Sequence, residues 1–157
     1  MKTAMLTVLA CAMLIGTAAA AEKPNFSGDW KMNASKSNFG PLPAPASITR
    51  KVTHADPALT IVEEQTGGLG EQTTTRAYTI DGKEITFNAN GADVTSSAVW
   101  EGDTLVVNSK VEIAGLTFND KMTMSEDGGS LTSVIHISSP QGDVDITIVF
   151  ERQVAAD

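Results

Sequence analysis

Five side chains that can form ion pairs or hydrogen bonds lie two positions away from apolar or aromatic residues along the chain. In a β-strand, successive side chains point to opposite faces, so a polar residue two positions from an apolar one shares its face. Each of these polar groups is therefore expected to point toward the same interior as its apolar neighbours. The candidates are Arg50, Glu63, Arg76, Tyr78 and Asp120.

These residue types suggest a site for an acidic head group. If Arg50, Arg76 and Tyr78 converge, they could hold a carboxylate, because a guanidinium binds a carboxylate through two parallel hydrogen bonds. The structural alternative is that the two arginines pair with Glu63 and Asp120, or extend their charged ends to the rim. The sequence leaves both interpretations open.

The residues needed for catalysis are sparse. His54 and His136 are the only histidines. His54 shares the inward face of Ile48 and Val52 by parity, but it lies beside the turn 55–57, where an exposed role is ordinary. His136 should point outward, opposite to its apolar neighbours. No spacing matches a metal site or a Ser-His-Asp arrangement, and nothing around either histidine favours haem. We therefore predict no catalytic residue, no metal and no cofactor.

The elements that position these residues are predicted to be strands. Apolar and polar residues alternate with period two, and turn residues such as Asp81-Gly82 and Asn90-Gly91 recur about every ten positions. The predicted strands are 26–33, 47–54, 58–66, 72–80, 84–88, 92–100, 103–113, 116–125, 130–139 and 143–152. In segment 103–113 the predicted inward residues are Leu105, Val107, Val111 and Ile113.

Strands joined in sequence order by tight turns predict an all-β fold, a single antiparallel up-and-down β-barrel of about 8–10 strands. A two-sheet sandwich is the alternative. Aromatic residues make up only 5% of the chain, so we expect an incompletely filled interior. The one long connection, 34–46, contains three prolines that bar it from a central strand. It is expected to flank one end of the barrel, either sealing that end or serving as an interaction loop.

The N-terminus has the pattern of a secretory signal peptide over residues 1–21. Lys2 is followed by an apolar run and a small-residue segment, with cleavage expected after Ala20 or Ala21. Cys11 fits a lipobox loosely, but the apolar run continues beyond it. The mature domain is then 22–157 and carries no thiol, which excludes disulfides. The expected location is periplasmic or extracellular.

The charge of the chain limits its partners. The sequence has 11 Lys and Arg against 19 Asp and Glu, and removal of Lys2 with the leader changes the formal charge from −8 to −9. Such a surface repels nucleic acid and anionic membranes. No later apolar run is long enough to form a transmembrane segment. We therefore expect neither nucleic-acid binding nor a membrane span, and the sequence identifies no protein partner.

Short motifs at both ends of the mature chain resemble a known group. Gly28-Asp29-Trp30 matches the Gly-x-Trp signature of lipocalins, which also carry an Arg on the final strand, as at Arg152. The longer patterns are similar to small secreted bacterial lipocalin-like proteins of calycin type. Those patterns are Phe26-x-Gly-x-Trp-Lys-x-Asn33, Ser35-Lys36-Ser37, Phe39-Gly40-Pro41, Asp81-Gly82-Lys83 and Phe150-Glu151-Arg152.

This resemblance implies a fold more than a function. It implies that Gly28, Trp30 and Arg152 close the barrel base, with the guanidinium stacked on the indole. Arg76-Ala77-Tyr78 resembles the Arg-x-Tyr pair of related fatty-acid-binding barrels, although there the pair lies near the C-terminus.

Three functional hypotheses follow from the sequence. The leading one is non-catalytic binding of a small hydrophobic or amphipathic molecule inside an exported barrel. The second is a protein-interaction or inhibitor module that acts through the loops at the barrel end. Enzymatic activity is the third, and it would depend on His54, Glu63 or Arg76.

Overall fold

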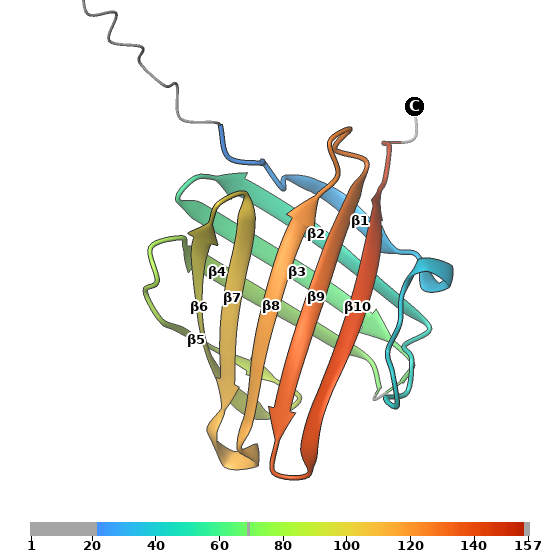
Figure 1. Cartoon of the computed structure of the whole chain (residues 1–157), viewed down its shortest axis with the longest axis vertical. Coiled ribbons are helices and arrows are strands. Elements are labelled where there is room, and N and C mark those ends of the chain that lie inside the picture. The colour runs from blue at the N-terminus through green and yellow to red at the C-terminus, as the bar shows by residue number, and fades with distance from the viewer. Residues whose placement is uncertain (1–21, 69, 156–157) are drawn as a thin grey trace, which may run out of the picture.

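Alternating apolar and polar residues give rise to a sheet of ten strands within the described part of the chain, residues 22–68 and 70–155 of a computed structural model (Figure 1). The predicted signal peptide lies outside these residues. The strands are β1 (Gly28–Met32), β2 (Ser47–Ala55), β3 (Ala58–Thr66), β4 (Gln72–Thr79), β5 (Ile85–Ala89), β6 (Ala92–Glu101), β7 (Thr104–Val111), β8 (Leu116–Met124), β9 (Ser130–Ser139) and β10 (Gly142–Arg152). Two short 3-10 helices are η1 (Ala34–Lys36) and η2 (Glu112–Ala114).

The strands form one antiparallel up-and-down barrel that is nearly closed. Their order in the sheet is β4-β3-β2-β1-β10-β9-β8-β7-β6-β5, so the first and last strands pair with each other. In Figure 1, β7 to β10 form the near wall and β2 to β4 cross behind them. Among the described residues, β4 and β5 are the two ends of the sheet. The prediction of a single up-and-down barrel is confirmed, and the sandwich alternative is wrong.

The side-chain alternation predicted from the sequence is present along the strands. On β2, for example, Ile48, Arg50, Val52 and His54 are buried while Lys51 between them is exposed. Because the side-chain period of a strand is two, this pattern fixes the register of each strand against the core.

Residue Ile113 is a correction to the predicted inward set. It is 89% exposed, because the chain leaves the extended conformation at η2 and the period of two ends there. Gly115 follows with φ 61°, a left-handed conformation that glycine adopts without strain and that leads the chain into β8. The predicted strand 103–113 therefore ends at Val111.

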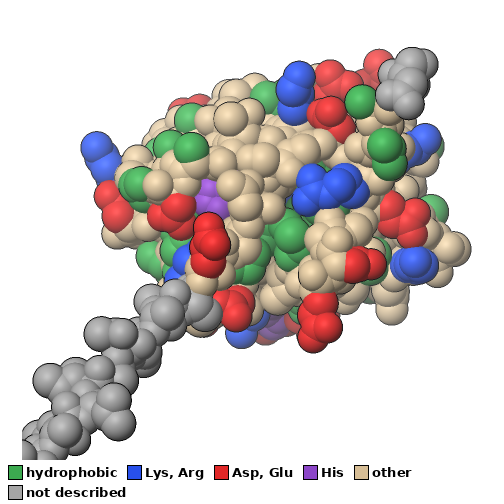
Figure 2. Space-filling view, turned by 90° about the horizontal axis from the view of Figure 1, so that it is seen from above, with side chains coloured by type: hydrophobic (Ala, Val, Ile, Leu, Met, Phe, Trp, Pro, Cys, Tyr) green, Lys and Arg blue, Asp and Glu red, His purple; other side chains and the backbone are tan. Residues whose placement is uncertain are grey.

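One end of the barrel is filled by large apolar side chains. Trp30 Nε1 donates a hydrogen bond of 2.9 Å to the Phe26 carbonyl, and both residues are fully buried. Figure 2 looks onto this end from above and shows acidic and basic side chains spread over it with hydrophobic ones between them. The buried residues packed behind this end include Leu59, Leu105, Met122, Leu131 and Phe150.

The seam between β1 and β10 joins the first and last strands of the described chain. Trp30 and Arg152 are register partners, and the Arg152 guanidinium carbon lies 4.2 Å from the Trp30 ring centroid. Arg152 also donates to the carbonyls of Ser27 (2.6 Å) and Gly128 (2.8 Å). Gly28 has φ +138°, and a Cβ there would collide with the guanidinium of Arg152. A glycine is therefore required where the arginine crosses β1.

The long connection from β1 to β2 passes over the other end of the barrel. Asn33 caps η1 through its side chain, which accepts from the N–H groups of Ser35 and Lys36. Asn38 then pairs with Thr147 of β10 through backbone hydrogen bonds of 2.7 and 2.8 Å. The proline-rich segment 40–46 follows and is attached at its far end by Ala46 N–H to Thr66 O, 2.8 Å. It thus bridges β10 and β3 across this end.

Candidate functional site

The interior of the barrel contains a cavity of about 520 Å³. This volume falls within the roughly 300–1,000 Å³ typical of small-molecule sites, and the interior is incompletely filled, as the scarcity of aromatics predicts. The walls are mainly apolar and include Ile48, Phe87, Val107, Ile135, Ile137 and Ile148. The mouth lies at the end spanned by the proline-rich segment, where Leu42, Pro43, Pro45, Asn90, Ala114 and Leu116 line the opening.

A cluster of charged side chains from four strands also lines the cavity. Arg50 (β2), Glu63 (β3), Arg76 (β4) and Asp120 (β8) all contribute to its surface. Arg50 Nε donates to Glu63 Oε2, and Arg76 Nη2 lies 3.2 Å from the same oxygen. One carboxylate is thus shared by two buried guanidiniums.

Neighbouring groups hold Arg50 in place. Its Nη1 donates to Ser133 Oγ at 3.0 Å, and its guanidinium carbon lies 4.2 Å from the Phe150 ring centroid. Ser133 Oγ in turn donates to Asp120 Oδ2 at 3.4 Å. Arg50 pairs with Glu63, donates to Ser133 and stacks on the Phe150 ring. Most of its hydrogen-bond donors therefore already have partners within the protein.

The pKa values of the two acids in the cluster move in opposite directions. Burial favours the neutral form of Glu63, but the charges of Arg50 and Arg76 outweigh it and lower the pKa of Glu63 to about 2. For Asp120 burial prevails over the same two arginines, and its pKa is raised. The pKa of Arg76 is raised, because Glu63 outweighs the effect of its burial. Glu63 is therefore the anion that both arginines share, whereas burial favours the neutral form of Asp120.

Two of these side chains keep unused hydrogen-bonding capacity. Within the described residues, Arg76 Nε and Nη2 and Asp120 Oδ1 are buried and have no hydrogen-bond partner. The contact of Arg76 Nη2 with Glu63 is an ion pair without hydrogen-bond geometry. A buried polar group without a partner costs about 1–3 kcal/mol, so these atoms mark where a polar molecule would be accommodated.

The structure brings four of the five predicted ligand-binding candidates to the cavity and directs the fifth elsewhere. Tyr78 is buried, but its hydroxyl lies 3.1 Å from Ser96 Oγ, which is 2.7 Å from Ser109 Oγ. Tyr78 is therefore not among the residues that line the cavity with Arg50 and Arg76. The structural alternative is that the arginines pair with Glu63 and Asp120: both pair with Glu63, whereas the hydrogen-bond partner of Asp120 is Ser133. Among the residues not predicted, Ser133 shares the face of Leu131 on β9, which is the signal that could have identified it.

The expectation that His54 is exposed is wrong. His54 is buried because Phe26 stacks on its ring, with centroids 5.8 Å apart, and Trp100 lies beside both. Its Nδ1 accepts the N–H of Phe26 at 3.1 Å, so the neutral ring carries its proton on Nε2, which is 3.8 Å from Asp56. Burial lowers the pKa of His54, against the opposing effect of Asp56. This histidine supports the filled end and does not line the cavity.

His136 lies on the outer surface, as expected. It is exposed, and its Nδ1 is 2.7 Å from Asp145 Oδ1 on the neighbouring strand β10. The hydrogen bond to Asp145 raises the pKa of His136. Residues 22–68 and 70–155 contain no group of three or more His, Cys, Asp and Glu side chains placed to hold a metal ion.

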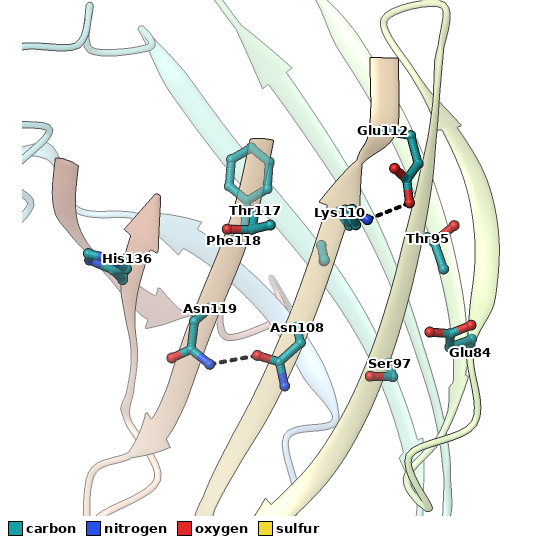
Figure 3. Close-up of a pocket in the computed structure, with 11 residues that line it drawn as sticks. Glu84, Thr95, Ser97, Asn108, Lys110, Glu112, Thr117, Phe118, Asn119 and His136 are labelled. Carbon is teal, nitrogen blue, oxygen red and sulfur yellow. Dashed lines mark hydrogen bonds and ion pairs between the residues drawn. The ribbon is translucent and has the colours of Figure 1, made fainter. Parts of the chain in front are cut away.

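A second hollow, of about 500 Å³, is lined mainly by polar side chains of the outer barrel face (Figure 3). Asn119 Nδ2 donates to Asn108 Oδ1 at 2.7 Å, and Lys110 pairs with Glu112 at 2.7 Å. The Asn119–Asn108 bond joins the adjacent strands β8 and β7, and the Lys110–Glu112 pair joins two exposed residues near the end of β7, so these groups already bind one another. The internal cavity, with buried and unpartnered groups, is therefore the stronger candidate for a site.

Comparisons with known proteins give relatives in structure alone. No protein-family model matches the chain, and no curated protein sequence matches it. A secretory abundant heat-soluble protein from Ramazzottius varieornatus has a TM-score of 0.63 at 12% identity, covering 83% of this chain and 98% of that one. Zebrafish ileal bile acid-binding protein, solved with cholic acid, has a TM-score of 0.62 at 15% identity, with 82% and 98% covered. Fatty-acid-binding protein 1 from Echinococcus granulosus gives 0.60 at 15%, with 82% and 98% covered.

This chain has the fold of the calycin-type barrels. At such low identities the similarity shows the fold and not the function. In the part of the chain that the structure describes, no helix is long and apolar enough to cross a membrane.

Proposed function

We propose that this protein binds a small hydrophobic or amphipathic molecule inside its barrel, without catalysing a reaction. The observation that carries the proposal is the cavity of about 520 Å³, which is apolar along its walls and carries buried, unpartnered polar atoms. Ligand sites in proteins combine these two features, a mainly apolar lining and a few polar groups that fix orientation.

The apolar walls supply the affinity in this proposal. Half-buried side chains such as Phe87, Phe118 and Ile137 face the cavity, and a ligand chain laid against them removes that area from water. Burial of apolar surface contributes about 25 cal/mol per Å² before the costs of association. Two of the structural neighbours are named for bile acids and fatty acids, which are amphipathic molecules of this kind.

The mouth supports binding rather than a loop-based partner site. Leu42, Pro43 and Pro45 of the proline-rich segment line the cavity. Pro45 is buried, and Gly68 of the β3–β4 connection lies close to Pro43 and Pro45, so this end of the segment is held against the barrel.

The first experiment is native mass spectrometry, with lipid extraction, on the mature protein purified from its own host. A reproducible mass above that of the protein, matched by an extracted small molecule, supports the proposal and identifies the ligand class. A cavity-filling variant provides the structural test. Ile137→Trp places a large ring in the cavity, and the ligand should be lost.

The matched control for that variant is Val134→Trp. Val134 lies on the same strand, β9, but on the outer face, where it is 46% exposed. A Trp there adds the same group without entering the barrel, so the ligand should stay. Equal retention of ligand by both variants would contradict binding in the cavity.

We also propose that the mature protein works outside the cytoplasm, in the periplasm or extracellular space. The support is the predicted leader of residues 1–21. N-terminal sequencing of the protein recovered from its host should find a start at Ala21 or Glu22.

A further inference from the structure

The unpartnered atoms of the cavity belong to one base and one acid that face each other across the barrel. Arg76 extends from β4 and Asp120 from β8, and both line the cavity. Their charges interact, as the effect of each on the pKa of the other indicates. In the described chain, Arg76 retains unpaired N–H donors and Asp120 retains an unpaired oxygen. A ligand group that provides partners for both residues must accept hydrogen bonds from Arg76 and form a hydrogen bond with the free oxygen of Asp120.

The charges of the cluster balance while Asp120 is ionised. The charged groups facing Asp120 are Arg50, Glu63 and Arg76. The carboxylates of Glu63 and Asp120 then match the two guanidiniums, so a ligand carboxylate would bring one excess negative charge into a buried site, which is strongly unfavourable. A proton on Asp120 removes that excess, because a neutral Asp120 leaves one guanidinium charge for the ligand carboxylate to neutralise.

We propose that the ligand bears a carboxylate, which Arg76 binds, and that its entry draws one proton from solvent onto Asp120. The Asp120 O–H then donates to one carboxylate oxygen while Arg76 donates to the other. The only bond formed is the O–H bond of Asp120, and its proton comes from the solvent buffer; one proton is taken up for each ligand bound above the pH at which free Asp120 ionises. This inference rests on the proposed function, because it names the head group of the molecule in the cavity. The raised pKa of Asp120 is consistent with it.

The test compares two probes that share a chain and differ in the head group, sodium decanoate and 1-decanol. Isothermal titration calorimetry is run on the mature protein, stripped of lipid, over pH 6 to 8.5. Two buffers with different heats of ionisation measure the protons taken up. Decanoate should bind with proton uptake that rises toward one per ligand, and its affinity should fall by up to about tenfold per pH unit where uptake is complete. Decanol binding should be independent of pH.

Two variants separate the roles of the base and the acid. Asp120→Asn imitates the protonated acid, so decanoate binding should lose its proton uptake and keep high affinity at pH 8.5. Arg76→Gln should weaken decanoate binding by at least about tenfold, the effect of losing one charged hydrogen bond, and leave decanol unchanged. Asp103→Asn, an exposed acid in the β6–β7 turn, is the control and should behave as the wild type.

The outcomes distinguish the two proposals. The head-group inference is overturned if decanol and decanoate bind with equal affinity, or if decanoate binds without proton uptake. Either result leaves the proposed apolar site in place. Uptake that persists in Asp120→Asn overturns the assignment of the proton. If neither probe binds the wild type, and the protein purified from its host carries no ligand, then both the proposed function and this inference are overturned.

Discussion

Replacement of Glu63 by Gln should destabilise the protein by about 3–5 kcal/mol. Glu63 is the shared acceptor of Arg50 and Arg76, and removal of its charge leaves two buried guanidiniums without their common partner. Loss of one member of a buried ion pair costs about this amount because the remaining charge stays buried. The pKa of Glu63 gives a similar magnitude, since the difference between 4.5 and about 2 corresponds to about 3 kcal/mol.

The assay is urea unfolding at neutral pH, followed by circular dichroism. A loss of this size is a large part of the roughly 5–15 kcal/mol available to a domain. Glu64→Gln is the matched control, because Glu64 is the next residue on β3 and is exposed on the opposite face. It should change stability by less than about 0.5 kcal/mol. Arg76→Gln added to Glu63→Gln should recover part of the loss, because it removes one of the uncompensated charges.

The pH dependence provides an independent check on the same residue. The folded state lowers the pKa of Glu63, so its contribution is complete above about 4.5 and is lost as the pH falls toward about 2. The difference in the free energy of unfolding between the wild type and Glu63→Gln should therefore become smaller as the pH falls from about 4.5 to about 2. The reasoning would be refuted if Glu63→Gln lowered the free energy of unfolding by less than about 1 kcal/mol at neutral pH, below the range expected for a buried pair. It would also be refuted if the difference in free energy of unfolding stayed constant from neutral pH down to about 2.

Three further predictions concern the filled end of the barrel. Trp30→Ala should cost about 3–5 kcal/mol in urea unfolding, as for other buried aromatics, and a change below about 1 kcal/mol would show that Trp30 does not support the core. Gly28→Ala should cost more than about 1 kcal/mol, because its φ of +138° is strained for alanine and the new Cβ meets Arg152; truncating Arg152 to Ala in the same chain should relieve the collision but not the backbone strain. Burial lowers the pKa of His54, so the unfolded state binds the proton first and stability should fall as the pH drops below 6.5. A His54→Asn variant, titrated in urea from pH 7 to about 5, should lose stability less steeply, and an unchanged slope would contradict the assignment.

Fold prediction succeeded because it depended on local, repeated signals. The period of two and the turn residues are properties of short segments, and they predicted ten strands whose bounds lie within two residues of those observed. They failed at Glu112–Ala114, where a 3-10 turn interrupts the alternation and Ile113 faces solvent. Nothing in the apolar character of Ile113 distinguishes it from the inward residues that precede it.

The sequence predicted which polar residues line the cavity but not which of them pair with one another. Parity placed Arg50, Glu63, Arg76 and Asp120 on the inner face, and all four line the cavity. Which of them pair depends on register and curvature. Arg50 and Glu63 are opposite each other on β2 and β3, but Asp120 reaches the same cavity from the far wall of the barrel.

His54 and Arg50 lie near opposite ends of the barrel, and the segment that covers each end decides their surroundings. This difference in covering segments explains why one end of the barrel is filled and the other is hollow. Both residues share a face of β2. At the His54 end, the segment before β1 folds back and places Phe26 on the ring, so a position next to a turn becomes buried. At the Arg50 end, the covering segment is proline-rich, and its Leu42, Pro43 and Pro45 line the same cavity as the charged cluster. The cavity is thus the space between the Trp30 core and the segment 40–46, and its chemistry is set by the charged residues that β2, β3, β4 and β8 direct into that space.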